Sequence, residues 1–507
     1  MKLSERLNEM RQADVVIVGA GNAAICAALA AKDAGANPVV VETAPESERG
    51  GNTFFVAGST RWVFNNLDDI REVLDLSEEE QRNVDFGTYS REDFLEDMGR
   101  VTQYRCDPDL AEALVDNARP TLVWMRTKGV KFEPMYKGQS QKVNGRVTFF
   151  GGQICNFWGG GPELSASLFK ALDKAGIPVF YETTAKSLVY EHGKVQGVVV
   201  EHAGEDYTIL SKAVVLASGG FQSNAEMRAR YLGPGYELAK VRGTQYNNGA
   251  GITMALAIGA VPHGHWSGSH AVGWDRNATP YGDRAVGDGF QKHSYIFSIM
   301  VNANGERFVD EGADFRNFTY AKYGHVVQQQ PGMFAWQIFD QKVDHLLRDE
   351  YRIKQVTKVT ANTLEELAGK LDGVDPKRFL ETVKEYNAAV QKDVPFEPVI
   401  KDGRGTTGLK VPKTNWANTI DQPPYQAFAV TCGVTFTFGG VKIDTACNVQ
   451  NVRGRGIPGL YAAGEMVGGI FYFNYPSGSG LVSGAVFGRL AGASAAAYVK
   501  QAGKQAA

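Results

Sequence analysis

Cysteine is scarce in this chain of 507 residues, and the few cysteines are scattered along it. None forms a Cys-x-x-Cys pair, which disfavours zinc sites, iron–sulfur clusters and a disulfide framework, so no metal site is expected. A strong excess of one charge is also missing, since the formal net charge is −3, and nucleic acid is therefore not an expected partner. The five cysteines are Cys26, Cys106, Cys155, Cys432 and Cys447.

Long apolar runs are missing as well. No apolar stretch reaches the length of a membrane span, so membrane insertion is not expected. The first residues, MKLSERLNEMRQ, alternate charged and apolar side chains and contain no apolar core of a signal peptide, which predicts a cytoplasmic protein. With 43% hydrophobic residues, the chain is long enough for two packed domains.

A stretch near the N-terminus has the pattern of a dinucleotide-binding unit. Residues 14–18 form a mostly apolar run that predicts a buried parallel strand, and a helix of small residues follows the next turn. Gly19 allows the tight turn, Gly21 lets the backbone approach a pyrophosphate, and Ala24 lets helix and strand pack closely. Glu42 ends a second strand and can accept hydrogen bonds from a ribose, while the helix N-terminus faces the phosphates.

Two distal features favour FAD over NAD as the dinucleotide. A second glycine-rich strand end, Gly464-Glu465, and a helix start at Gly480 lie far along the chain, whereas a nicotinamide enzyme needs only one nucleotide unit. A flavin needs such distal groups, because a helix N-terminus can stabilise negative charge at the N1/C2=O edge of the reduced ring.

The order of predicted elements indicates a split domain. Residues 178–217 predict a β-meander, and a small-residue helix closes the chain over 480–498. The expected fold class is α/β, with a Rossmann-like FAD-binding domain that is split in sequence and an inserted α+β capping or substrate domain. The predicted boundaries are 11–264 and 438–507 for the two parts of the FAD-binding domain, and 265–437 for the capping domain.

Six motifs together resemble the fumarate reductase/succinate dehydrogenase flavoprotein family (FAD-dependent oxidoreductase 2), over nearly the whole chain. The sequence is most similar to soluble members of tricarballylate dehydrogenase type, through HWSGSHAVGW, DRAVGDGFQKHSY and FNYPSGSGL. The resemblance implies FAD, a flavin domain and a mobile capping domain. It also implies non-covalent FAD, because the glycine loop lacks the histidine of covalently flavinylated members. The motifs are Gly19-x-Gly21-x-x-Ala24, Gly50-Gly51-Asn52-Thr53, Ala217-Ser218-Gly219-Gly220-Phe221, NGAGITMA at 248–255, Val301-Asn302-x-x-Gly305-x-Arg307-Phe308-x-x-Glu311 and Ala463-Gly464-Glu465.

The motif and the resemblance together predict the residues that hold the cofactor. Glu42 is expected at the ribose, and Ala185 is expected behind the adenine by family position. Asn52 and Thr53 suit phosphate or flavin contacts, although an ordinary polar loop would have the same composition. The full set is Gly19, Gly21, Asn22, Ala23, Glu42, Thr43, Gly50, Gly51, Asn52, Thr53, Gly58, Ala185, Ala217, Ser218, Gly219, Gly464, Glu465, Ser479, Gly480 and Leu481.

Two segments depart from the family pattern. Fumarate reductases have His-His-Thr-Met-Gly-Gly for a substrate carboxylate, and residues 435–440 here read Thr-Phe-Thr-Phe-Gly-Gly. Those enzymes also have a substrate-clamping arginine before the last helix, where this chain has Tyr475. The segment Tyr475-Pro476-Ser477-Gly478 resembles 3-ketosteroid Δ1-dehydrogenases, in which the tyrosine polarises a carbonyl. Fumarate itself is therefore not the expected substrate.

Arg307 is the first candidate for catalysis, because it resembles the family arginine that moves a proton opposite the flavin. The alternative is a surface arginine in a hairpin, since Asn304-Gly305 is a turn signal. An arginine is a poor base by its pKa, so part of its role is expected to be electrostatic, as a bidentate clamp on a carboxylate.

Four further residues are candidates for substrate contacts. His270 matches a family histidine that contacts a carboxylate, and a hydrogen-bonded structural histidine is the alternative. His293, in Lys292-His293-Ser294-Tyr295, is a weaker candidate, and Arg316 is expected to support the contacts from behind. Tyr475 precedes the flavin-facing helix, which favours substrate contact over a role as a core tyrosine.

The sequence therefore predicts an FAD-dependent dehydrogenase or reductase acting on CH–CH groups next to a carboxylate or carbonyl. A di- or tricarboxylate of tricarballylate type is the expected substrate. One alternative is a 3-ketosteroid Δ1-dehydrogenase-like enzyme using Tyr475 and Gly480. Another is an electron-transfer flavoprotein subunit, or a flavin-binding module without turnover. An electron-accepting protein or quinone-linked partner would then be a separate chain, because no iron–sulfur or haem motif is present.

Overall fold

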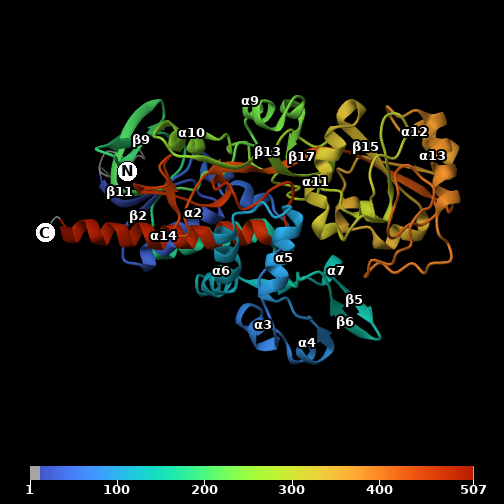
Figure 1. Cartoon of the computed structure of the whole chain (residues 1–507), viewed down its shortest axis with the longest axis horizontal. Helices are drawn as coiled ribbons and strands as arrows, with labels where there is room; N and C mark the ends of the chain where they lie inside the picture. The colour runs from blue at the N-terminus through green and yellow to red at the C-terminus, as the bar shows by residue number, and fades with distance from the viewer. Residues whose placement is uncertain (1–11, 506–507) are drawn as a thin grey trace. The chain divides into compact units, whose positions relative to one another are not determined.

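The computed structural model describes residues 12–505, which form two compact units (Figure 1). Within the described residues, unit 1 comprises residues 12–237, Gly243–Ser269 and residues 436–505, and unit 2 comprises Leu238–Arg242 and His270–Thr435. The capping domain was predicted at 265–437. Unit 2 differs from this range, because residues 265–269 and 436–437 belong to unit 1 and the short segment 238–242 belongs to unit 2. The prediction that the first residues form no signal peptide concerns mainly residues 1–11, which lie outside the described residues.

Unit 1 is built on an eight-stranded sheet whose central strands are parallel. Its order is β18-β19-β11-β1-β2-β8, and every neighbouring pair from β19 to β8 is parallel. The side chains of β2 are all buried, as expected for a parallel strand covered on both faces. The strands are β1 (Gln12–Val18), β2 (Pro38–Val41), β8 (Val179–Phe180), β11 (Glu205–Leu216), β18 (Asn448–Gln450) and β19 (Gly456–Ala462).

The predicted meander is present. Strands β9 (Thr183–Glu191) and β10 (Lys194–His202) pair antiparallel with each other, and β10 pairs antiparallel with β11. The turns between them contain Gly193 and Gly204, both with positive φ, which glycine adopts without steric cost. This meander leads the chain back into the parallel sheet through β11.

Helices α2 (Asn22–Asp33) and α14 (Ser479–Gln505) pack side by side in unit 1 (Figure 1). A Cβ atom added at Gly488 or Gly492 would overlap the backbone carbonyl of Ala23 or Ala27. The small residues of both helices therefore allow a close backbone approach. One stretch of α14, Ser479–Gly503, is long and apolar enough to span a membrane, with mean hydropathy 1.2, contrary to the sequence expectation. Because 61% of its most apolar window is buried against the protein, it has the character of a core helix.

We expect Gly492→Ala to destabilise the protein by roughly 1–3 kcal/mol, because the added methyl group must displace the backbone of α2. Thermal unfolding followed by circular dichroism measures the loss. Gly503→Ala, in the same helix but with no atom within 4 Å of the added Cβ, is the control and should be neutral or slightly stabilising. Equal melting temperatures for the two variants would contradict the close packing.

The remaining elements of unit 1 are mainly helices and short strands. The charged region 66–130 forms four helices, of which α4 and α5 begin with a capping box made by Ser77 and Ser90. The elements are η2 (Gly51–Phe55), α3 (Leu67–Val73), α4 (Glu78–Asn83), β3 (Val84–Asp85), α5 (Arg91–Val101), α6 (Pro108–Thr127), β4 (Phe132–Pro134), α7 (Tyr136–Gln139), β5 (Ser140–Val143), β6 (Arg146–Phe149), β7 (Cys155–Phe157), α8 (Gly160–Ala175), α9 (Ala225–Met227), α10 (Ala250–Ala257) and η10 (Gly464–Met466).

Unit 2 is an α+β body around a second sheet. Strands β14 and β16 run antiparallel to β15 and β17, and helices α12 and α13 cover one apolar core that includes Trp336, Phe379 and Tyr386. The long strands β13 and β17 contribute residues to both units. The elements are β12 (Lys240–Val241), β13 (Pro262–Asp275), η5 (Ser294–Phe297), β14 (Ile299–Val301), η6 (Arg316–Phe318), α11 (Tyr320–Gln328), β15 (Phe334–Phe339), β16 (Lys358–Ala361), α12 (Leu364–Lys370), α13 (Pro376–Ala389) and β17 (Tyr425–Val441).

Candidate functional site

The carboxyl ends of four parallel strands in unit 1 bring the predicted cofactor residues to one edge of the sheet. Gly19–Ala23 follow β1, Glu42-Thr43 follow β2, Ala217–Gly219 follow β11 and Gly464-Glu465 follow β19. Backbone hydrogen bonds join these strand ends, from the Gly19 N–H to the Val41 carbonyl (2.8 Å) and from the Ala217 N–H to the Val18 carbonyl (2.9 Å). Ligands of open α/β sheets bind at this edge.

The N-terminus of α2 is suited to a pyrophosphate. Gly21 is its N-cap, no side chain caps the helix, and its first turn carries no acidic residue. The N–H groups and the positive end of the helix dipole therefore face this edge without a competing carboxylate. The Asn22 N–H donates to Thr53 Oγ1 (2.9 Å), and the Asn22 amide donates to the Leu481 carbonyl (2.8 Å). Three predicted segments thus meet at the start of α2.

Glu42 is buried at the end of β2, as the ribose-binding prediction requires. Its Oε1 accepts the Ala44 N–H at 2.8 Å. Burial raises the pKa of its carboxyl, and hydrogen bonds from the Ala44, Ala20 and Thr43 N–H groups oppose that rise. A carboxylate held in this way keeps lone pairs for the hydroxyl groups of a ribose.

We expect Glu42→Ala to weaken FAD binding by about 1–3 kcal/mol, because it removes a charge-assisted acceptor. Fluorescence titration of the apoprotein with FAD measures the change in Kd. Glu46→Ala is the control, since the Glu46 side chain is 68% exposed and pairs only with Arg49 at the surface. An unchanged Kd for Glu42→Ala would exclude the ribose role.

Glu465 joins three loops of unit 1. Its Oε2 accepts hydrogen bonds from the Gly220 N–H (2.9 Å), the Gln222 amide (2.9 Å) and the Asn247 amide (3.2 Å). Its Oε1 accepts the Asn52 amide (3.1 Å), and the Thr244 N–H donates to the same Asn52 side chain (3.0 Å). Burial raises the pKa of Glu465, and these donors oppose the rise. The structure thus adds a positioning role to the predicted cofactor role of Glu465 and Asn52.

The other predicted cofactor residues lie on the same elements. Gly50 has φ 107° and caps η2, which carries Gly51, Asn52 and Thr53. Ser479, Gly480 and Leu481 open α14, where the Ser479 hydroxyl donates to the Pro476 carbonyl (2.6 Å). The arrangement as a whole fits a dinucleotide, because it combines a free helix N-terminus, a buried carboxylate and glycine turns at strand ends.

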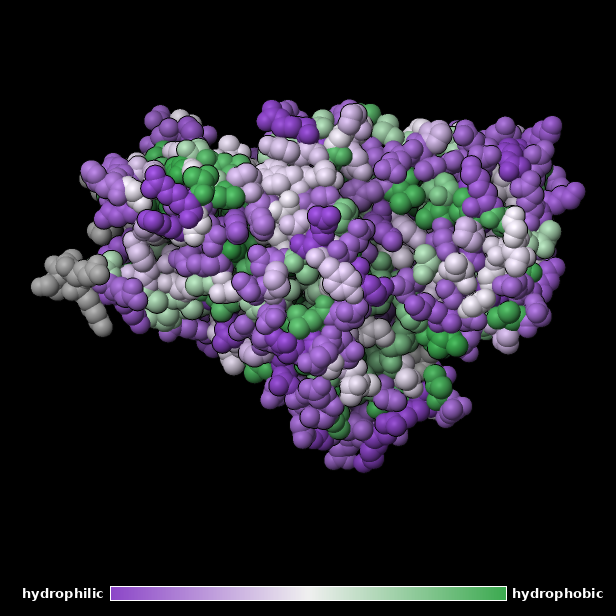
Figure 2. Space-filling view, viewed as in Figure 1, coloured by the Kyte–Doolittle hydropathy of each residue, from purple (hydrophilic) through white to green (hydrophobic). Residues whose placement is uncertain are grey.

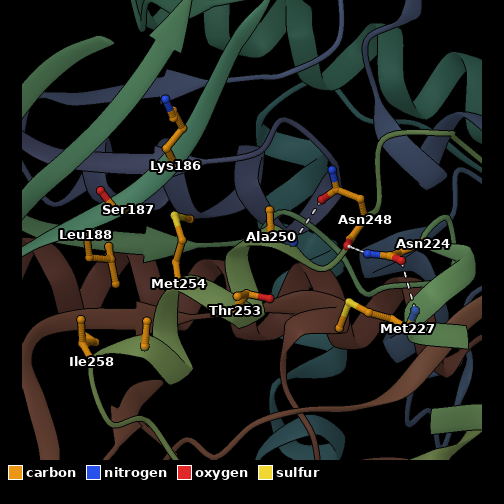
Figure 3. Close-up of a pocket in the computed structure, with 11 residues that line it drawn as sticks. Lys186, Ser187, Leu188, Asn224, Met227, Asn248, Ala250, Thr253, Met254 and Ile258 are labelled. Atoms are coloured by element: carbon orange, nitrogen blue, oxygen red, sulfur yellow. Dashed lines mark hydrogen bonds between the residues drawn. The ribbon is translucent and has the colours of Figure 1, made fainter. Parts of the chain in front are cut away.

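A cavity of about 420 Å³ lies between β9 and α10 in unit 1 (Figure 3). Leu188, Met254 and Ile258 give it an apolar wall, and in Figure 2 a hydrophobic patch lies over α10. Asn224 and Asn248 mark its polar end, where the Asn224 amide donates to the Asn248 carbonyl (3.1 Å). Ala185, the predicted adenine contact, is buried in β9 next to the lining residue Lys186 but does not itself line this cavity.

Three of the predicted catalytic residues form one buried cluster in unit 2. The rings of His270 in β13 and His293 before η5 both meet the ring of Tyr320 edge-on, with centroids 5.1 Å and 4.8 Å apart. The Arg316 guanidinium lies 5.4 Å from the same Tyr320 ring. Burial lowers the pKa of both histidines well below the usual value, and the charge of Arg316 adds to this at His293. Both imidazoles are therefore neutral at pH 7.

Arg316 is the cation of this cluster. It is 9% exposed, and its Nη2 donates to the Asn317 side chain (2.9 Å). Burial and the nearby Arg348 lower its pKa to about 10, so it remains charged at neutral pH. Among residues 12–505, no carboxylate forms an ion pair with it. A buried arginine in this state has the chemistry to accept an external anion.

Arg307 lies in a different group of contacts in unit 2. Its Nη2 pairs with Glu311 Oε2 (2.5 Å), and its guanidinium also donates to the carbonyls of Val411 (2.7 Å), Val309 (3.3 Å) and Pro412 (3.2 Å). It lies 5.2 Å from the ring of Tyr386 in α13. The structure therefore gives Arg307 a set of protein partners, and its predicted role in proton transfer stays a prediction.

The other cations near the cluster are paired within the protein. Arg242 makes a bidentate ion pair with Asp288 (2.6 and 2.8 Å), and Arg348 pairs with Glu350 (2.9 Å). Lys292, the neighbour of His293 in sequence, donates to the Gly289, Phe290 and Gln291 carbonyls, and burial lowers its pKa to about 8. Arg242, Arg348 and Tyr320 were not predicted, because no local motif marks them.

Tyr475 belongs to a group of rings in unit 1 at the start of α14. With Phe436, Phe438 and Phe471 it forms what we call the aromatic cluster, with centroid distances of 5.4 to 6.2 Å. A Cβ atom at Gly480 would lie 3.4 Å from Tyr475 and 3.6 Å from Phe436. The cluster therefore borders the helix turn at which the sequence places the flavin.

Comparison with known proteins gives consistent matches over most of the chain. A family model described as an FAD binding domain matches residues 14–482. A probable fumarate reductase, Ifc3 of Shewanella frigidimarina, is 32% identical over 499 residues, covering 96% of this chain and 75% of that protein. A 3-oxosteroid 1-dehydrogenase of Mycobacterium tuberculosis is 28% identical over 414 residues, covering 75% of this chain and 70% of that protein.

The solved structure of the open conformation of a flavocytochrome c3 fumarate reductase matches with a TM-score of 0.71 and 27% identity. The match covers 98% of this chain and 81% of the flavocytochrome chain. Together with the geometry of the sheet edge, these matches establish the predicted flavoprotein fold, FAD as the cofactor and an oxidoreductase acting on CH–CH groups. The chain therefore belongs to the FAD binding domain family, among flavoproteins of fumarate reductase/succinate dehydrogenase type.

Proposed function

We propose that this enzyme interconverts a C–C single bond and a C=C bond next to the carboxylate of an organic acid. The observation that carries the proposal is Arg316, a buried cation without an ion-pair partner among residues 12–505. A carboxylate would satisfy its planar fork bidentately. The probable fumarate reductase of Shewanella frigidimarina supports an acid of this kind by its name.

Bound FAD supplies the two-electron acceptor or donor for hydride. In the dehydrogenation direction, the proton alpha to the carboxylate leaves to a protein base and the hydride leaves the adjacent carbon, which forms the C=C bond. We assign the proton transfer to Arg316: its charged guanidinium donates the proton to the alpha carbon in the reduction direction, and its neutral form accepts that proton in the dehydrogenation direction. A pKa lowered to about 10 makes the neutral form more accessible than it is for an ordinary arginine. The neutral His270 and His293 orient and polarise the acid without adding charge.

The finer predictions are part of this proposal. A tricarballylate-like di- or tricarboxylate stays a candidate substrate, although the pairing of Arg307, Arg242 and Lys292 leaves fewer free cations than a polyanion needs. We also propose non-covalent FAD, a cytoplasmic location and electron exchange with a separate protein or a quinone-linked partner.

A ketosteroid dehydrogenase is the second candidate. Tyr475 lies beside Gly480 at the start of α14, and a 3-oxosteroid 1-dehydrogenase is among the relatives. The buried cation of unit 2 argues against it, because a neutral steroid would leave Arg316 without an anion.

A set of candidate substrates, assayed under anaerobic conditions, tests the proposal. Chemically reduced holoprotein is mixed with α,β-unsaturated mono-, di- and tricarboxylates, and with a 1-dehydro-3-ketosteroid. We expect at least one acid to reoxidise the flavin and the steroid to leave it reduced. Reoxidation by the steroid alone would favour the second candidate.

A further inference from the structure

Gln153 is a buried glutamine of unit 1 whose side chain has no hydrogen-bond partner among residues 12–505. The side chain is 0% exposed, yet neither Oε1 nor Nε2 forms a hydrogen bond with the described part of the chain. An unpaired amide in the interior costs free energy, so buried amides are almost always paired with the protein, with water or with a ligand. This carboxamide is therefore expected to bind something other than the chain itself.

The carboxamide lies against the turn that leads into α14. A Cβ atom added at Gly478 would lie 2.5 Å from Gln153 Nε2 and 2.8 Å from the Thr60 carbonyl oxygen. Gly478 has φ 86°, which a glycine adopts without steric cost, and α14 begins at the next residue, Ser479. Gln153 therefore lies where the segment after Gly58 meets the start of α14, and both segments carry predicted cofactor residues.

Polar side chains near the carboxamide already have acceptors within the chain. The Thr60 hydroxyl donates to the Cys155 carbonyl at 3.0 Å. Arg61 Nε donates to the Ser477 carbonyl at 2.7 Å. The Gln153 carboxamide thus keeps its own donor and acceptor for a bound group.

We propose that Gln153 binds the pyrimidine edge of the flavin ring of FAD. That edge has an N3–H donor between two carbonyl acceptors. A carboxamide is complementary to it, since Oε1 can accept the N3–H while Nε2 donates to a carbonyl beside it. The predicted place of the ring supports this edge, because the N-terminus of α14 is expected at the neighbouring N1/C2=O positions. Gln153 is thus a further FAD-binding residue, outside the set predicted from the sequence.

The test is Gln153→Met, which nearly keeps the volume of the side chain but removes both polar atoms. Fluorescence titration of the apoprotein with FAD should give a Kd at least ~10-fold higher than for the wild type, the change expected when two neutral hydrogen bonds are lost. The melting temperature of the apoprotein should stay the same or rise, because the substitution removes a buried amide that has no protein partner. An unchanged Kd would overturn the inference.

Gln337→Met is the matched control, since Gln337 is a fully buried glutamine of unit 2 whose amide is paired within the chain. Its Nε2 donates to the Lys292 carbonyl (3.0 Å), and its Oε1 accepts the Tyr351 hydroxyl (2.6 Å). We expect this variant to lower the melting temperature of the apoprotein and to leave the Kd for FAD unchanged. The same pattern in Gln153→Met would indicate a structural role and overturn the inference.

FAD methylated at N3 decides if Gln153→Met does not fold, or if its melting temperature falls while its Kd rises. The methyl group removes the N3–H that Gln153 accepts, so we expect the wild-type protein to bind this flavin with a Kd at least ~10-fold higher than for FAD. Equal affinities for the two flavins would overturn the inference. The proposed function stands in either case, because the inference concerns the cofactor and not the substrate.

Discussion

Replacing Arg316 with lysine is expected to lower the rate of flavin reduction or reoxidation by substrate by at least ~100-fold, the low end for positioned acid–base groups. Lysine keeps the charge but loses the planar fork and its fixed donor directions. FAD content should not change, because every predicted FAD contact belongs to unit 1 and Arg316 belongs to unit 2. Stopped-flow absorbance of the flavin, with the acid that is active in the set of candidate substrates, measures the rate.

Arg307→Lys is the matched comparison. Arg307 donates to Glu311 and to three backbone carbonyls, so we expect its substitution to lower stability more than the rate. The opposite result would be a lower rate of flavin reduction or reoxidation in Arg307→Lys at normal stability, with an unchanged rate in Arg316→Lys. Proton transfer would then belong to Arg307, as the sequence motif predicted. The two variants together therefore assign proton transfer to one of the two arginines.

Glu311→Ala is expected to destabilise the protein by about 3–5 kcal/mol, because it leaves the charge of Arg307 buried without its partner. Glu311 is fully buried, and besides the Arg307 guanidinium it accepts the Met300 N–H at 2.7 Å. Urea denaturation followed by tryptophan fluorescence measures the change in the free energy of unfolding.

The control for this variant is Glu306→Ala, which removes an acid from the same hairpin. The Glu306 side chain is 50% exposed and pairs with Arg378 at 3.4 Å, so its loss should cost less than about 1 kcal/mol. Equal effects of the two substitutions would contradict the structural role assigned to the Arg307–Glu311 pair.

The sequence predicts the dinucleotide unit well, because its determinants are local. Gly19, Gly21 and Glu42 lie within one strand–helix–strand unit, and β2 ends at Val41, directly before Glu42. The return of the pattern at Gly464-Glu465 also predicts that the distal segment joins the same sheet, and β19 does pair with β11. Because these strands are parallel, their carboxyl ends lie on one edge of the sheet, and this can be predicted without any side-chain detail.

The substrate residues could not be ranked in the same way. Arg307 and Arg316 belong to one motif region, and the difference between them comes from partners distant in sequence, such as Val411 and Pro412. The meeting of His270 and His293 at Tyr320 depends on the folding of β13, η5 and α11 around one another. Periodicity and spacing contain no information on which buried cation keeps its donors for a ligand.

The measurement that tests the central claim most directly is the product of a single anaerobic turnover. Reduced holoprotein is mixed with an equal amount of the unsaturated acid that reoxidises the flavin, and the acid is then identified by mass spectrometry. The proposed reaction predicts one saturated acid formed for each flavin oxidised, with the carboxylate retained. Flavin oxidation without conversion of the acid, or no oxidation by any carboxylic acid, would contradict it.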